Sequence, residues 1–124
     1  MILIADDSKF MRIYLKQILQ NQGYTKFVEA INGEQAIILY RLLKPKLVFL
    51  DITMPIFDGL TVLREIMKIN PEAKIIMCSA LGTREHKQTA LELGAVDFVT
   101  KPNFDSIHAI LKEINKKSGD EANA

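Results

Sequence analysis

Cysteine is almost absent from this chain of 124 residues, which contains only Cys78. A single cysteine cannot form an internal disulfide bond, so no such bond can stabilise the fold. Cys78 lies in the apolar run 75–78, where a small buried hydrophobic residue in a reducing cytoplasm is the simplest interpretation. The sequence therefore predicts a fold that depends on an ordinary hydrophobic core.

The chain also lacks a large net charge and long hydrophobic segments. The formal net charge is +1, so no overall electrostatic field attracts the chain to nucleic acid or to a membrane surface. No apolar stretch approaches the roughly 20 residues of a membrane span, and the N-terminus has no basic targeting segment. We therefore expect a cytoplasmic protein that neither binds nucleic acid nor inserts into a membrane.

The remaining composition is typical of a soluble globular domain, with 48% hydrophobic and 25% charged residues. A chain of this length can bury one hydrophobic core but is too short for two ordinary domains. We expect a single domain over residues 1–117 and a polar C-terminal tail over 118–124. Because only this tail follows the last predicted helix, we expect no effector domain, so output must pass through a partner.

Short apolar segments alternate with amphipathic segments five times along the chain. Strands are predicted at residues 1–6, 26–31, 46–51, 74–78 and 96–100. Helices are predicted at residues 9–22, 34–43, 60–69, 84–93 and 104–117. This alternation indicates an α/β fold with a doubly wound parallel sheet that helices cover on both faces.

Three acidic residues stand where predicted strands end. Asp6 and Asp7 end the first apolar run, and Asp51 ends the run 47–50. In open parallel sheets, ligands bind outside the carboxyl ends of the strands, so these carboxylates should converge. A like-charge pair about 4 Å apart near a surface costs on the order of 4 kcal/mol. The cluster therefore predicts a site for a divalent cation and for phosphate chemistry.

Two further polar residues follow predicted strands and should reach the same edge. They are Ser79 after the fourth strand and Lys101 after the fifth. Three carboxylates and one ammonium sum to a charge of −2, which one Mg²⁺ balances with its preferred oxygen ligands. A phosphoryl group added to Asp51 would draw the hydroxyl and the ammonium inward through charge-assisted hydrogen bonds. A chemical change at one carboxylate would then move two loops.

Four segments together resemble the response-regulator receiver domains, most closely the stand-alone chemotaxis regulators of that family. The segments are 6–12 (DDSKFMR), 51–59 (DITMPIFDG), 75–82 (IIMCSALG) and 101–102 (KP). The resemblance covers nearly the whole chain. It implies a flavodoxin-like (βα)5 fold whose five parallel strands are arranged in the order 2-1-3-4-5.

The resemblance also implies a role for each acid. Asp51 would be the phosphoacceptor and would take its phosphoryl group from the phosphohistidine of a sensor histidine kinase or histidine phosphotransfer protein. Asp6, Asp7 and Asp51 would bind Mg²⁺ together with the backbone carbonyl of Thr53.

Three other residues would then report the phosphorylation, as the resemblance implies. Lys101 would contact the acyl phosphate, with a cis peptide bond before Pro102. Ser79 would be the hydroxyl switch, and Phe98 the aromatic residue that turns inward with it. The surface that changes would comprise the helix at 84–93, the strand at 96–100 and the helix at 104–117.

Each of these residues also has a plainer interpretation. Asp7 and Ser8 could cap the first helix, Ser79 could be a loop serine, and Phe98 could be a core aromatic residue. Other titratable residues fit structural roles better than ligand roles. They are Asp58 in a turn, Asp97 at the start of a strand, and His86 and His108 on polar helix positions.

Three positions depart from the family pattern. Asn103 replaces the aromatic residue that commonly follows the lysine-proline pair. Thr53 and Leu81 occupy the two positions that tune hydrolysis, where polar side chains can orient an attacking water. Leu81 should exclude water, so we expect a longer-lived phosphoryl-aspartate than in relatives with a polar pair. Replacing Leu81 with glutamate should accelerate phosphate loss in a phosphoprotein decay assay, and an unchanged rate would contradict this expectation.

The leading hypothesis is therefore a response regulator that is a phosphoacceptor and not an enzyme in the ordinary sense. Its output partner would be a flagellar motor switch component if the pathway is chemotaxis, and a phosphorelay outside chemotaxis is the alternative. The protein would be a monomer, with dimerisation on phosphorylation as the other option. A metal-dependent phosphatase typically has a second acid two residues after its nucleophile, where this chain has Thr53. A flavin carrier would have its phosphate repelled by Asp6 and Asp7.

Overall fold

The structure is a computed structural model that describes residues 1–80 and 83–118, with side chains as far as Lys116. Its strands are β1 (Ile2–Ala5), β2 (Phe27–Ala30), β3 (Leu47–Asp51), β4 (Ile75–Ser79) and β5 (Asp97–Thr100). Its helices are α1 (Lys9–Asn21), α2 (Gly33–Leu43), α3 (Gly59–Ile69), α4 (Arg84–Glu92) and α5 (Ile107–Ser118). Within these ranges, no helix combines the length and the hydrophobicity needed to cross a lipid bilayer.

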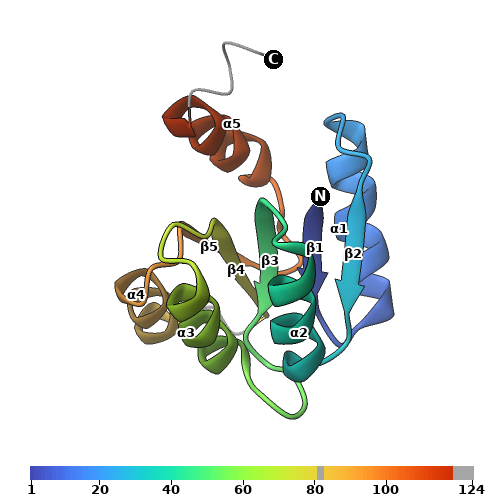
Figure 1. Cartoon of the computed structure of the whole chain (residues 1–124). Coiled ribbons are helices and arrows are strands. Elements are labelled where there is room, and N and C mark those ends of the chain that lie inside the picture. Colours follow the sequence, from blue (N-terminus) through green and yellow to red (C-terminus); the bar gives the residue numbers. More distant parts are fainter. Residues whose placement is uncertain (81–82, 119–124) are drawn as a thin grey trace.

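The five strands form one parallel sheet in the order β2-β1-β3-β4-β5, which confirms the predicted doubly wound, flavodoxin-like topology (Figure 1). Ala5 is paired with Leu50 across β1 and β3, and Asp51 with Cys78 across β3 and β4. At the far side, Ser79 is paired with Thr100. This register places the carboxyl ends of the central strands at one edge of the sheet.

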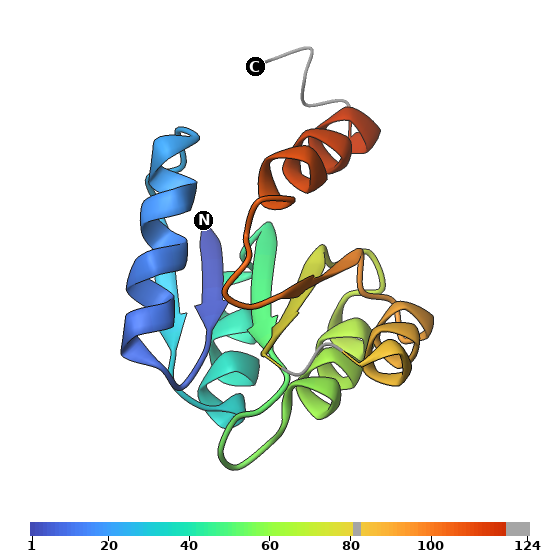
Figure 2. The ribbon, with the colours of Figure 1, turned by 180° about the vertical axis from the view of Figure 1, so that it is seen from behind.

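Helices cover both faces of the sheet and create two hydrophobic layers (Figures 1 and 2). Helices α2, α3 and α4 pack on one face, where Leu3, Val48 and Met77 are fully buried. Helices α1 and α5 pack on the opposite face, which includes Ile4 and Phe49. Because successive strand residues point to opposite faces, strands covered on both sides are hydrophobic at almost every position. This explains why β1, β3 and β4 appear in the sequence as continuous apolar runs.

The last helix begins later than the sequence predicted. The expected start at residue 104 is wrong, because α5 begins at Ile107. The side-chain oxygen of Asn103 accepts a hydrogen bond from the backbone N–H of Asp105 (3.0 Å), and the N–H of Ile107 donates to the carbonyl of Phe104 (3.1 Å). These local bonds make turns of residues 103–106, since asparagine side chains compete with helical hydrogen bonding.

Other element boundaries differ from the prediction by a residue or so. Helix α4 ends at Glu92 with Leu93 as its C-cap, and β5 begins at Asp97 and not at residue 96. Helix α5 continues through Ser118, the first residue of the predicted tail. The rest of that tail, residues 119–124, lies outside the described residues.

The loop after β3 is packed tightly against the start of α3. The N–H of Gly59 donates to the carbonyl of Ile52 (2.6 Å), and a Cβ atom at Gly59 would overlap the backbone carbonyl of Asp51. Asp58 caps α3 by accepting a hydrogen bond from the N–H of Thr61 (2.8 Å), which agrees with its predicted structural role. The Asp58-Gly59 pair thus holds the backbone that carries Asp51.

Candidate functional site

The three acids predicted to converge lie together at the carboxyl edge of the sheet. One carboxylate oxygen from each of Asp6, Asp7 and Asp51 lies within 4.8 Å of the other two. Asp6 and Asp51 are buried, with 6% and 5% of their surface exposed, whereas Asp7 is exposed. The exposed member leaves the cluster open to solvent on one side, so a small cation or a phosphoryl donor can approach it.

Helix α1 leaves Asp7 available to this cluster. The N-cap of α1 is Ser8, whose hydroxyl accepts a hydrogen bond from the N–H of Met11 (3.3 Å). The N–H of Ser8 in turn donates to Oδ1 of Asp6 (2.9 Å). Of the two residues that could have capped the helix, Ser8 takes that role.

Lys101 provides the positive charge inside the cluster. Its Nζ lies 2.8 Å from Oδ2 of Asp6 and 3.3 Å from Oδ1 of Asp51. Burial by itself would lower the pKa of Lys101, but the ion pairs with the two carboxylates outweigh it and hold that pKa above its ordinary value. Lys101 is therefore positively charged at neutral pH. The peptide bond that joins it to Pro102 is cis, as expected.

The site disfavours the ionised form of Asp51. Burial and the neighbouring charge of Asp6 raise its pKa to about 6, although Lys101 acts in the opposite direction. A cation bound between the carboxylates would favour the ionised form. The site is thus electrostatically strained without a cation and relieved by one.

This strain predicts a pH-dependent stabilisation by Asp51→Asn in buffer free of divalent cations. The raised pKa means that the folded protein binds more protons than the unfolded chain between about pH 4 and 6, so stability falls as the pH rises through that window. Asparagine has no such ionisation. We expect Asp51→Asn to raise the free energy of unfolding at pH above 7 by about 1–2 kcal/mol, after allowance for solvent screening.

Urea unfolding with a chelator present, repeated across the pH range, measures this difference. The gain should shrink toward about pH 4, where the wild-type carboxyl is increasingly neutral in both the folded and the unfolded chain. An asparagine variant less stable than wild type at every pH would contradict the prediction. Asp58→Asn is a suitable control, since it changes an acid of the same loop outside the cluster.

The other predicted residues occupy different positions around the cluster. Ser79 is buried at the end of β4, and its carbonyl accepts a hydrogen bond from the N–H of Lys101 (2.8 Å). Phe98 is 7% exposed and packs in the layer covered by α2, α3 and α4. Thr53 is exposed in the loop after β3, and Leu81 lies outside the described residues.

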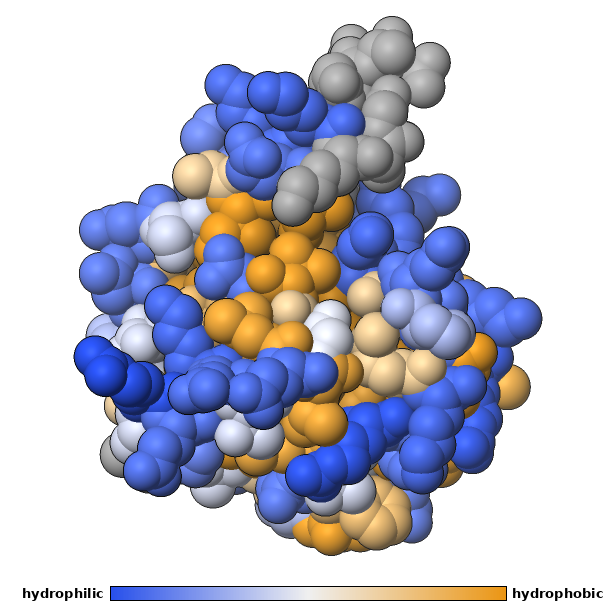
Figure 3. Space-filling view, turned by 90° about the vertical axis from the view of Figure 1, so that its left-hand side faces the viewer, coloured by the Kyte–Doolittle hydropathy of each residue, from blue (hydrophilic) through white to orange (hydrophobic). Residues whose placement is uncertain are grey.

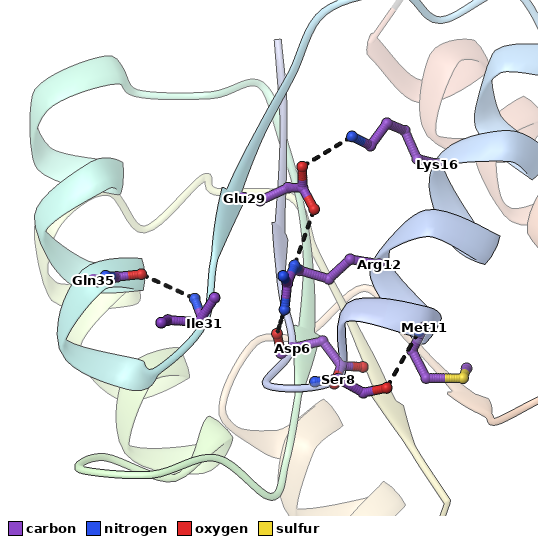
Figure 4. A network of polar contacts seen from close by, with 8 residues as sticks. All are labelled: Asp6, Ser8, Met11, Arg12, Lys16, Glu29, Ile31 and Gln35. Carbon is purple, nitrogen blue, oxygen red and sulfur yellow. Dashed lines mark hydrogen bonds and ion pairs between the residues drawn. The ribbon is translucent and has the colours of Figure 1, made fainter.

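A network of charged residues that the sequence patterns did not predict lies behind the cluster (Figure 4). Arg12 donates to the backbone carbonyl of Asp6 (2.8 Å) and to Glu29 (2.9 Å), and Lys16 donates to the other oxygen of Glu29 (2.9 Å). The available signal was an arginine on the apolar side of α1, one helical turn before Leu15. Charged residues on such a face are seldom buried unless they are paired.

The donors of the cluster suit a hard cation. Carboxylate oxygens are the ligands that Mg²⁺ prefers, and one or two carboxylates with waters and phosphate oxygens are its usual set. Softer metals would call for histidine or cysteine, and the described acid cluster contains neither. The residues present therefore fit Mg²⁺.

Comparison with known proteins agrees with this geometry. Residues 2–112 match the response regulator receiver domain. The chain belongs to this family. It is 45% identical to the chemotaxis protein CheY of Thermotoga maritima over 117 residues, which covers 94% of this chain and 96% of that protein. It is 47% identical to CheY of Bacillus subtilis over 115 residues, which covers 93% and 94% of the two chains.

A solved structure supports the same conclusion. The complex of CheX and CheY with BeF3 and Mg²⁺ from Borrelia burgdorferi contains a chain that superposes with a TM-score of 0.83 at 38% identity, covering 93% of this chain and 86% of that one. The protein is thus a receiver domain similar to CheY, a phosphoacceptor signalling protein and not a classical enzyme. Membership of this family favours neither the phosphatase nor the flavin carrier as an interpretation.

Proposed function

We propose that Asp51 accepts a phosphoryl group from the phosphohistidine of a sensor histidine kinase or a histidine phosphotransfer protein. The observation that carries this proposal is the placement of Asp51 at a strand end with Asp6, Asp7 and Lys101 around it. An oxygen of Asp51 forms a bond to phosphorus while the bond from phosphorus to the imidazole nitrogen breaks. The imidazole leaves with the electron pair of that bond, and the product is an aspartyl phosphate.

We assign the Mg²⁺ ligands to Asp6, Asp7, Asp51 and the backbone carbonyl of Thr53. The cation, when bound, supplies charge neutralisation for the phosphoryl oxygens. The chain's own contribution is geometric: Ser8 and Lys101 hold the two oxygens of Asp6, and the packed loop at Gly59 holds the backbone of Asp51. Lys101 can leave its carboxylate partners for a phosphoryl oxygen without a change in its own charge.

Movement of Lys101 and of the Ser79 hydroxyl toward the phosphoryl group would alter the backbone of β4 and β5. Phe98 lies in β5, which pairs with β4 and leads to Lys101, and it would move with them as the aromatic part of the switch. The proposed output surface consists of α4, β5 and α5. Figure 3 shows hydrophobic side chains gathered on this side of the molecule. Leu91 of α4 is 42% exposed, and Val96, which directly precedes β5, is 37% exposed. An apolar surface of this kind suits a protein partner.

The pathway we propose is chemotaxis in the cytoplasm, because the relatives at 45–47% identity are chemotaxis proteins. The partners would be a histidine kinase and a flagellar motor switch component, and the Borrelia relative forms a complex with CheX. A single-domain phosphorelay intermediate is the alternative pathway. The hydrolysis-tuning roles of Thr53 and Leu81 stay predictions.

The experiment that tests this function is treatment of the purified protein with acetyl phosphate and Mg²⁺, followed by identification of the modified residue. Modification of a residue other than Asp51 would overturn the assignment. The protein bound to beryllofluoride and Mg²⁺ should then be titrated with a purified motor switch component and, separately, with a phosphotransfer domain. Enhanced binding to the first supports chemotaxis, and binding to the second alone supports the relay.

A further inference from the structure

The buried guanidinium of Arg12 has a partner that connects it directly to the acid cluster. Only 9% of Arg12 is exposed, and its Nη1 donates to the backbone carbonyl of Asp6 at 2.8 Å (Figure 4). Arginine provides several donors in one rigid plane, so a single side chain can hold two groups at once. Its Nε donates to Oε1 of Glu29 at 2.9 Å.

Asp6 is held at every polar group. Its N–H donates to the carbonyl of Ala30 (3.0 Å), which continues the pairing of β1 with β2. Its carboxylate oxygens accept from the N–H of Ser8 and from Nζ of Lys101. Its carbonyl accepts from Arg12. The hydrogen bond from Arg12 therefore acts on the peptide unit between Asp6 and Asp7.

The peptide unit between Asp6 and Asp7 is planar, so its carbonyl and the N–H of Asp7 move together. A hydrogen bond to the carbonyl therefore restrains the rotation of that plane. The rotation sets how the side chain of Asp7 is directed relative to that of Asp6. Both carboxylates contribute an oxygen to the cluster, so the orientation of this single peptide affects two of its three acids.

Arg12 is itself anchored to a neighbouring strand. Glu29 lies in β2, and its second oxygen accepts from Nζ of Lys16 at 2.9 Å. The hydrogen bond from Lys16 and the contact with Arg12 hold the pKa of Glu29 below its usual range despite partial burial. This network of contacts thus joins α1, β2 and the end of β1, with Arg12 at its centre.

We propose that Arg12 is a positioning residue that orients the Asp6-Asp7 peptide so that both carboxylates bind one Mg²⁺. The proposal rests on the magnesium site proposed above. Groups that orient metal ligands typically account for a 10–100-fold effect on metal affinity. A purely electrostatic effect of the substitution would act in the opposite direction, because removing a cation close to an acidic site should strengthen the binding of Mg²⁺. The direction of the change therefore separates the two effects.

The test is calorimetric titration of Mg²⁺ into the unphosphorylated full chain and three variants, with circular dichroism to verify folding. We expect Arg12→Met to weaken Mg²⁺ binding at least about tenfold. Arg12→Lys should fall between it and wild type, since the ammonium can donate to the carbonyl but lacks the rigid planar fork whose separate nitrogens hold the carbonyl and Glu29 in fixed directions. The matched control is Lys16→Met, which removes the hydrogen bond from Lys16 to Glu29 and leaves the contact between Arg12 and Asp6. The Mg²⁺ affinity of this control should stay within about twofold of wild type.

Several outcomes would overturn the inference. Equal or tighter Mg²⁺ binding by Arg12→Met is one. A second contradicting outcome is that Arg12→Lys unfolds at a lower temperature but binds Mg²⁺ with unchanged affinity, which would assign Arg12 a structural role only. If Arg12→Met does not fold, the result for Arg12→Lys decides between the two roles. Failure of the wild-type protein itself to bind Mg²⁺ would instead remove the proposed metal site, so the two failures are distinguishable.

Discussion

Asp51→Asn should abolish covalent phosphorylation by acetyl phosphate in the presence of Mg²⁺. The amide has no anionic oxygen to attack phosphorus, and it removes one of the three carboxylates that the cluster offers to the cation. The loss should be complete within the sensitivity of intact-protein mass spectrometry, where the wild type gains the mass of one phosphoryl group. No other described acid shares this combination of a position at the end of β3, burial and contact with Lys101.

The matched control is Asp58→Asn, a change of the same chemistry further along the loop that follows β3. The new amide side chain could still cap α3, because asparagine is as good an N-cap as aspartate. This variant should be labelled as well as wild type. Persistent labelling of Asp51→Asn would mean that the phosphoacceptor lies elsewhere, and the site assignment would have to be abandoned.

Lys101→Met should separate metal binding from switching. Its ammonium lies 2.8 Å from Asp6 and 3.3 Å from Asp51, with only 11% of the side chain exposed. Removing one partner of a buried ion pair typically destabilises a protein by about 3–5 kcal/mol. We expect a loss of about this size in chelator. Mg²⁺ should bind about tenfold more tightly than in wild type because the competing cation is gone, so saturating Mg²⁺ should recover about 1.4 kcal/mol of the difference in stability.

The same variant should fail to respond once the phosphoryl mimic is bound. Beryllofluoride with Mg²⁺ should shift the amide resonances of Ser79 and Phe98 in the wild type, whereas in Lys101→Met these resonances should stay at their unactivated positions. Lys68→Met provides the control, since Lys68 forms an exposed ion pair with Glu65 on α3, outside the acid cluster. A normal shift in Lys101→Met would show that the lysine does not transmit the change.

Much of the fold could be predicted because it is encoded locally. The spacing of apolar residues marks each strand and each helix. The alternation of strands and helices permits few topologies other than a parallel sheet covered on both faces. The start of α5 could not be obtained in this way. The apolar spacing of Ile107, Ile110 and Leu111 identifies the buried face, but the turn made by Asn103 and Phe104 determines where the helix begins.

The sequence by itself determined that three acids, a serine and a lysine stand at strand ends, and hence that they share one edge of the sheet. Only the tertiary structure decided how they are held. Lys101 and Asp6 are 95 residues apart, and Arg12 and Glu29 are 17 apart, so no local pattern links either pair. Burial likewise raises the pKa of Asp51 to about 6, which depends on what packs around it. Periodicity is a property of neighbours along the chain, whereas charge pairing and desolvation depend on distances in space.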